Sequence, residues 1–278
     1  MHTPVLLQET IDALVIKPGR KYIDCTFGSG GHSFEIARLG GDVLALDYDK
    51  TAVEKGKAEA KRRNILLVYG NYANIEKIAK VNNYIACAGI LFDLGLSMEQ
   101  LEGDRGFSYK KEDAFLDMRL SEEIDITAYD IVKSYSENEL YEALVKGAEE
   151  LNSWAIVQSI VRARRINPIK TVGDLNRIVK NGTSLSGQRL EKVLRKVYQA
   201  LFICVNNEFE NLKNGLNGAF KCLGSREIIA VISFHSGQER IIKRFAKDKR
   251  LKMKVIRKKG DEARKFERSA TLRILKKI

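Results

Sequence analysis

Short apolar runs alternate with longer stretches of helical periodicity over about the first 105 residues. Four runs have the length and the near-continuous apolar character of buried strands: Tyr22–Cys25, Val43–Asp47, Ile65–Tyr69 and Gly89–Asp93. Such strands, separated by helices, are typical of a parallel sheet that is covered on both faces. This part of the chain is therefore predicted to be α/β.

The pattern then changes, and residues 106–204 are predicted to form an all-helical insert. Ser136 and Glu139 have the spacing of a capping box, the reciprocal hydrogen-bonding pattern that begins many helices. Apolar residues at helical spacing continue from Leu190 to Leu212, which predicts one long helix there.

Strand character returns near the carboxyl end of the chain. The candidates are Ile228–Phe234, Leu251–Ile256 and Ala270–Leu275. The last of these is predicted to be an antiparallel strand at the edge of the sheet. The simplest organisation is one discontinuous α/β domain, residues 1–105 with 205–278, interrupted by the helical insert.

Charge is distributed unevenly along the chain, whose formal net charge is +12. Residues 241–278 hold 16 Lys and Arg against 4 acidic residues, and residues 161–199 hold 10 against 2. Residues 112–150 have the opposite balance, with 3 basic and 12 acidic residues. Two basic segments favour a polyanionic partner, because each neutralised phosphate releases counterions. Charge alone does not separate RNA from DNA or from an anionic membrane.

The remaining composition points to a cytoplasmic protein. No segment approaches the roughly 20 apolar residues that a membrane span needs, and the first residues do not have the basic head of a secretory signal. The four cysteines are scattered, so neither a disulfide framework nor a metal site is predicted. They are Cys25, Cys87, Cys204 and Cys222.

A glycine-rich turn, Asp24–Ser33, follows the first predicted strand and precedes a predicted helix. The second strand ends in Asp47, 19 residues after Gly28, where a carboxylate can accept hydrogen bonds from ribose hydroxyls. Together they indicate nucleotide binding, although a tight connection and a solvated carboxylate would give the same pattern. The turn lacks the G-x-G-x-x-G spacing of dinucleotide sites and any basic residue for a pyrophosphate. A phosphate-free cofactor, S-adenosylmethionine, is therefore preferred.

With these motifs in view, the sequence resembles the family that methylates N4 of a cytosine in the decoding region of 16S ribosomal RNA. The matching stretches follow one another in order along nearly the whole chain. They are His2–Glu9, Thr26–Ser33, Leu91–Leu101, Arg105–Tyr109, Leu116–Arg119, Tyr198–Leu201, Val205–Glu208, Ile232–Ser236 and Arg268–Ala270. The resemblance implies a Rossmann-like class I S-adenosylmethionine-dependent methyltransferase sheet with an inserted helical domain, residues 106–204 here, that recognises the RNA substrate.

The resemblance also implies a set of cofactor-binding residues. They are Gly30, Gly31, His32, Asp47, Tyr72, Asp93 and Gln100. Tyr72 follows the third strand and can cover an adenine, or merely cap the core. Asp93 ends the fourth strand, at the edge where open α/β sheets bind ligands. For His32 and Gln100, only the resemblance favours contact.

The base pocket is expected near the end of the returning strand. Phe234 and Ser236 are candidate substrate contacts, with Phe234 stacking on an extruded cytosine. His235 and Asn206, together with Asp93, are the candidate catalytic residues, although Asn206 can equally cap helical backbone. Arg268 and Ser269, in the basic tail, are expected to meet phosphate.

The sequence leaves other functions open. One is a methyltransferase of the same fold that acts on another RNA or on DNA, and another is a non-catalytic assembly factor of the small ribosomal subunit. Four segments depart from the family pattern: Ser97–Glu99, Gly147–Leu151, Ser236–Glu239 and Lys265–Glu267. The oligomeric state is not indicated.

Overall fold

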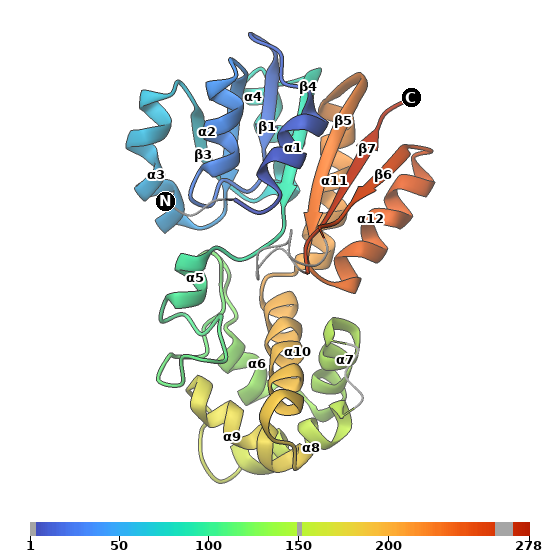
Figure 1. Ribbon diagram of the computed structural model, residues 1–278. Coiled ribbons are helices and arrows are strands. Elements are labelled where there is room, and N and C mark those ends of the chain that lie inside the picture. The colour runs from blue at the N-terminus through green and yellow to red at the C-terminus, as the bar shows by residue number, and fades with distance from the viewer. Residues whose placement is uncertain (1–3, 149–151, 259–268) are drawn as a thin grey trace. The chain divides into compact units, whose positions relative to one another are not determined.

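The computed structural model describes the whole chain except residues 1–3, 149–151 and 259–268 (Figure 1). The chain divides into two compact units. The first, which we call the sheet unit, is Met1–Gly95 with Phe209–Ile278. The second, the helical unit, is Leu96–Glu208.

The sheet unit is built on one seven-stranded sheet with the order β3-β2-β1-β4-β5-β7-β6. The strands are β1 (Lys21–Asp24), β2 (Asp42–Asp47), β3 (Leu66–Tyr69), β4 (Cys87–Asp93), β5 (Leu223–Ser233), β6 (Lys252–Ile256) and β7 (Thr271–Lys276). The first five in spatial order are parallel, so the carboxyl ends of β1, β2 and β4 lie at one edge. The predicted α/β class is confirmed.

The position of β7 corrects one prediction. This strand is antiparallel, as expected, but it lies between β5 and β6 and is not at the edge. Five of its six residues are buried, which suits an interior strand. The edge strand is β6, whose first four residues are exposed and include Lys252 and Lys254. Exposed charge on an edge strand opposes pairing with another chain.

Alternating residues of the strands point to opposite faces, and each face has its own core. Ile23, Leu44 and Ile90 belong to one core, whereas Tyr22 and Val43 belong to the other. The first core is completed by α4 (Ile75–Val81), α11 (Glu208–Cys222) and α12 (Ser236–Asp248), and the second by α1 (Leu7–Leu14), α2 (Gly31–Arg38) and α3 (Lys50–Arg62) (Figure 1). The sheet is therefore covered on both faces.

The helical unit contains α5 (Met98–Glu102), α6 (Ala128–Ser134), α7 (Glu137–Ala148), α8 (Ser153–Arg164), α9 (Val172–Thr183) and α10 (Gly187–Val205). These helices share a separate apolar core that includes Leu144, Ile160 and Val197. The capping box predicted before α7 is confirmed, because Glu139 Oε2 accepts from the Ser136 N–H at 2.8 Å and Ser136 Oγ accepts from the Glu139 N–H at 3.3 Å.

The long helix expected from Leu190 to Leu212 is two helices. α10 ends at Val205 and α11 begins at Glu208, because Asn207 has a φ of 45°, a left-handed conformation that ends a helix. This break coincides with the boundary between the units at 208/209, whereas the sequence placed that boundary at 204/205. The sequence placed the other boundary at 105/106, but it lies at 95/96. The reason is that Leu96 and Leu101 already pack against the core of the helical unit.

Candidate active site at the carboxyl edge of the sheet

The glycine-rich turn joins β1 to α2. Gly30 has a φ of 86°, in the left-handed region that favours glycine. A Cβ at this position would lie 2.3 Å from the ring of Phe34 and 2.7 Å from that of Phe27, so a larger residue would displace both aromatics. Gly31 is the first residue of α2. The turn therefore brings bare backbone to the start of a helix, as a nucleotide site requires.

Asp47 is linked directly to this turn. Its Oδ2 accepts a hydrogen bond from the Gly28 N–H at 2.7 Å, and its Oδ1 accepts from the Asp49 N–H at 2.8 Å. These two bonds hold the carboxylate in one orientation at the end of β2. Burial raises the pKa of Asp47 to about 6, so it is largely ionised at neutral pH.

Asp24 braces the turn from the interior. The side chain is fully buried, and its Oδ2 accepts from Ser33 Oγ at 2.7 Å. Its Oδ1 accepts from the Thr26 N–H at 3.1 Å. Burial raises the pKa of Asp24 to about 7. Its hydrogen bonds show that Asp24 shapes the turn.

Asp93 and His32 meet beside the turn. The Asp93 N–H donates to Thr26 Oγ1 at 2.7 Å, and Asp93 Oδ2 lies 3.8 Å from His32 Nδ1. His32 Nε2 lies 3.2 Å from the Val5 carbonyl oxygen, so Nε2 carries the proton and Nδ1 is an acceptor. Burial lowers the pKa of His32 to about 4. Burial, and then the charge of Asp24, raise the pKa of Asp93 to about 7.

The donor and acceptor chemistry of this edge fits S-adenosylmethionine. When Asp93 is ionised, His32 Nδ1 and Asp93 Oδ2 are two hydrogen-bond acceptors 3.8 Å apart, and neither carries a proton. They suit a ligand with an ammonium group, and Asp47 suits ribose hydroxyls. The turn from residue 24 to residue 33 has no Lys or Arg to neutralise a phosphate. Its residues therefore fit a cationic cofactor better than a pyrophosphate.

Two aromatic pairs lie near this edge. The ring of Tyr72 packs edge-on against Phe92 at 5.6 Å, so part of its surface is used in the core. Tyr48, which the sequence argument missed, directly follows Asp47 and stacks on Tyr69 with ring centroids 5.9 Å apart. The signal available in the sequence was its position next to Asp47, the carboxylate expected to contact a ribose. Tyr48 is thus a second candidate for contact with an adenine.

The predicted base-pocket residues follow β5. Phe234 and His235 are half-buried, and Ser236 is exposed at the first position of α12. His235 is the N-cap of this helix, since its side chain accepts from the Gln238 N–H at 3.4 Å. Ser269 is exposed and lies two residues before β7. Arg268 lies outside the described residues.

Two predicted site residues belong to the helical unit, where both have local roles. Asn206 is buried; its Oδ1 accepts from the Leu120 N–H, and its Nδ2 donates to the Met118 carbonyl, both at 2.8 Å. Gln100 Oε1 accepts from the Ser97 N–H at 2.9 Å in a capping box of α5. The other described site residues all belong to the sheet unit. Asn206 and Gln100 instead bond to loop and helix backbone within the helical unit.

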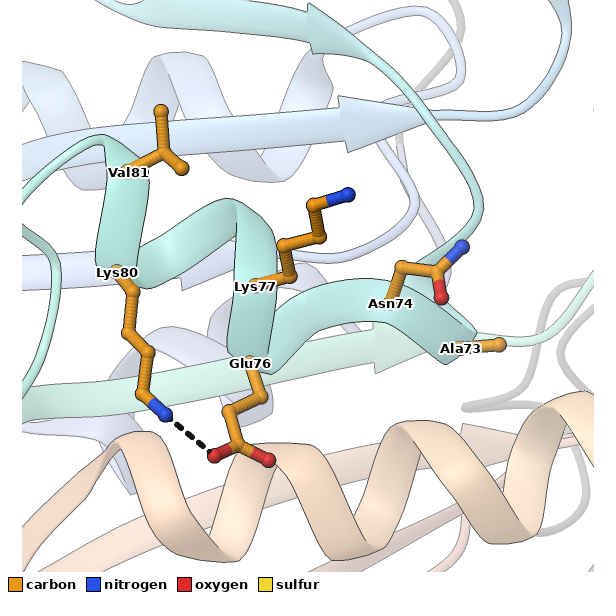
Figure 2. Close-up of a pocket in the computed structure, with 6 residues that line it drawn as sticks. All are labelled: Ala73, Asn74, Glu76, Lys77, Lys80 and Val81. Atoms are coloured by element: carbon orange, nitrogen blue, oxygen red, sulfur yellow. Dashed lines mark hydrogen bonds and ion pairs between the residues drawn. The ribbon is translucent and has the colours of Figure 1, made fainter.

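Other features of the described residues lie away from this edge. Figure 2 shows a hollow lined by Ala73, Asn74, Glu76, Lys77, Lys80 and Val81. Glu76 is paired there with Lys80 at 2.7 Å, and no predicted site residue lines it. The four cysteines are free. Among the residues described, there is no cluster of potential metal ligands and no helix that is long and apolar enough to cross a membrane.

Comparison with known proteins decides the family. The model of the MraW methylase family matches residues 1–278. The chain belongs to this family. Ribosomal RNA small subunit methyltransferase H of Clostridium botulinum (strain Kyoto / Type A2) is 37% identical, over 100% of this chain and 99% of that protein. The protein of the same name from Mycoplasma mycoides subsp. mycoides is 40% identical, over 87% of this chain and 80% of that protein.

Membership confirms the resemblance inferred from the motifs, the methyltransferase class and the cofactor, S-adenosylmethionine. Solved structures match more distantly. An rRNA methylase from Streptococcus thermophilus is 10% identical with a TM-score of 0.46, covering 100% of this chain and 99% of that chain. The roles of individual site residues remain predictions that rest on the geometry described above.

Proposed function

We propose that this protein transfers a methyl group from S-adenosylmethionine to N4 of a cytidine in the decoding region of 16S ribosomal RNA. The observation that carries the proposal is the match to the MraW methylase family over residues 1–278. The relatives are named as methyltransferases of small-subunit ribosomal RNA, which supports this substrate.

The cofactor would be held at the carboxyl edge of the sheet. Asp47 would accept from the ribose hydroxyls, while Asp93 and His32 would accept from the ammonium group. Gly30 and Gly31 would let backbone approach the ligand closely. When bound, S-adenosylmethionine supplies a methyl group on a positively charged sulfur. The protein must then exclude water and place a nucleophile in line with that methyl group.

The acceptor nitrogen is a poor nucleophile because its lone pair is delocalised into the cytosine ring. Phe234 would stack on the extruded base, and Ser236 would contact it from the first turn of α12. His235 would orient the amino group or take up its proton, as a neutral imidazole can. Asp93 is the alternative acceptor for this proton, because its pKa is raised to about 7 by burial.

RNA recognition is assigned to the helical unit. Exposed basic side chains are concentrated on its last two helices and on the loops around them. They include Lys170, Arg177, Lys180, Arg189, Lys192 and Arg195. Such a surface binds phosphates without reading bases, which would position the RNA. Ser269, two residues before β7, would add a phosphate contact, and Arg268 is proposed to do the same.

The decisive experiment measures transfer of a radiolabelled methyl group by the purified protein to small ribosomal subunits, free 16S RNA and DNA. Nucleoside analysis of the product then identifies the methylated position. We expect N4-methylcytidine in ribosomal RNA. Label in DNA, in another RNA or on another atom would contradict the proposed substrate, and absence of transfer would favour a non-catalytic assembly factor. The comparison of subunits with free RNA also identifies the assembly state of the substrate.

A further inference from the structure

The side chain of Gln238 ties together the chain segments that leave β4 and β5. Its Oε1 accepts a hydrogen bond from the Phe234 N–H at 2.8 Å. Its Nε2 donates to the Leu94 carbonyl oxygen at 3.3 Å. Only 1% of Gln238 is exposed, so these bonds are shielded from water. One amide therefore bridges two strand ends that are 140 residues apart along the chain.

The bridge fixes the turn after Asp93. The Leu94 N–H donates to the Ile232 carbonyl oxygen at 3.0 Å, which extends the pairing of β4 with β5 by one residue. With its carbonyl bonded to Gln238, Leu94 has both backbone polar groups directed to the β5 side. Asp93 before it and Gly95 after it are consequently held in place.

The ring of Phe234 lies against the same turn. A Cβ added to Gly95 would come within 2.7 Å of two carbon atoms of this ring. The contact therefore requires glycine at position 95, and it sets how closely the aromatic face approaches the turn. Because Gln238 fixes the backbone of both Phe234 and Leu94, it determines this approach.

Gln238 is itself held by an ionic anchor at the next residue. Glu239 Oε1 accepts from Ser233 Oγ at 2.9 Å and from Arg273 Nε at 2.8 Å. Arg273 is buried on β7, with 2% of its surface exposed. The first turn of α12 is thus attached to β5 and β7, and the amide of Gln238 cannot drift from the strand ends.

We infer that Gln238 is a positioning residue for methyl transfer, which sets the spacing between the Asp93 turn and the aromatic face of Phe234. The inference rests on the proposed function, in which these segments hold the methyl donor and the acceptor base. Transfer in line depends steeply on such spacing. An amide is suited to this position because it accepts one bond and donates the other.

Two substitutions separate positioning from general stability. Gln238→Ala removes both bonds. Gln238→Glu keeps the acceptor for Phe234 but places a carboxylate oxygen against the Leu94 carbonyl, unless the carboxyl is protonated. The titratable groups on the segments that Gln238 joins are Asp93, His235 and Glu239, and the last is already paired with Arg273.

We expect kcat for ribosomal RNA to fall about tenfold or more in Gln238→Ala, as loss of a positioned hydrogen bond predicts, and to fall less in Gln238→Glu, which keeps the acceptor for Phe234. The affinity for S-adenosylmethionine should change much less than kcat, because the Asp93 N–H remains bonded to Thr26 Oγ1. The deficit of Gln238→Glu, relative to wild type at each pH, should shrink from pH 9 to pH 6, and that of Gln238→Ala should not. Gln8→Glu makes the same change at an exposed position of the sheet unit and should have no effect.

Hydrogen exchange tests the bridge without turnover. The Phe234 amide should lose protection in Gln238→Ala and keep it in Gln238→Glu. Unchanged protection of the Phe234 amide in Gln238→Ala, or a kcat of Gln238→Ala within about twofold of wild type, overturns the inference. A wild-type protein that transfers no methyl group to ribosomal RNA contradicts the proposed function instead, while the exchange result still decides whether the bridge exists.

Discussion

The Gly28 N–H donates a hydrogen bond to Asp47 Oδ2 at 2.7 Å, which joins the glycine turn after β1 to the carboxylate at the end of β2. The two most informative features of the sequence are therefore parts of one site. A change at Asp47 would therefore alter the shape of the turn as well as the proposed contact with the ribose.

Asp47→Ala is expected to weaken binding of S-adenosylmethionine by at least about 100-fold, because two charge-assisted hydrogen bonds are worth roughly 1.5–3 kcal/mol each. Isothermal titration calorimetry measures the change. The control is Asp42→Ala at the other end of β2, where the side chain is exposed and bonded to Tyr84. Unchanged affinity in Asp47→Ala would remove the ribose assignment.

Asp93→Asn is expected to change how stability depends on pH. Burial raises the pKa of Asp93 to about 7 in the folded protein, above its ordinary value of about 3.9. Between pH values of about 3.9 and 7, the folded state binds more protons than the unfolded state. The free energy of unfolding of the wild type therefore falls as pH rises through this range.

Asparagine has no such cost. The stability of Asp93→Asn relative to wild type should therefore increase from pH 5 to pH 8, by about 1–3 kcal/mol. Urea unfolding of the cofactor-free proteins at both pH values measures this. A difference that stays constant with pH would show that Asp93 is ionised normally.

His235 has a structural role as the N-cap of α12, which must be separated from its proposed chemical role. Asparagine is also a favourable N-cap, so His235→Asn keeps the cap and removes the imidazole, whereas His235→Ala removes both. We expect kcat to fall about 100-fold in each variant, and His235→Ala to lose about 1 kcal/mol more stability. Full activity of His235→Asn would show that His235 only caps α12 and takes no part in the reaction.

Asn206→Ala is expected to destabilise the helical unit, because it leaves the Leu120 N–H and the Met118 carbonyl without their buried partner. The cost should be about 2–4 kcal/mol of unfolding free energy. Binding of S-adenosylmethionine to the sheet unit should not change. If kcat fell about 100-fold with stability intact, the amide would act in the reaction as the sequence suggested.

Lys192→Ala tests RNA binding by the helical unit. Loss of one phosphate contact should weaken binding of 16S RNA and reduce the slope of log K against log salt concentration by about 1. Lys133→Ala is the matched control, since Lys133 is an exposed cation within the acidic segment of the same unit. Equal effects of the two substitutions would contradict a specific basic surface.

Much of the site could be predicted from local sequence. A glycine at a positive φ, a strand that ends in a carboxylate and an apolar run of strand length are each specified by neighbouring residues. The turn at Gly30 and the strand ends at Asp47 and Asp93 could therefore be predicted before the fold was known. The capping box at Ser136 is equally local.

Features set by distant parts of the chain could not be predicted. The apolar pattern of β7 shows a strand, but its place between β5 and β6 depends on which partners it pairs with. The break at Asn207 interrupts a helical pattern that continues on both sides. Gln238 shows the same limit, since its bond to Leu94 joins residues far apart in sequence.

The sequence by itself determined the α/β class, the helical insert and the acidic residues at the ends of β2 and β4, because periodicity and turn chemistry act over a few residues. The tertiary structure decided the order of the last strands, the structural use of Asn206 and the bridge between β4 and β5. Buried polar groups must find partners wherever the folded chain brings them, and no local pattern specifies those partners.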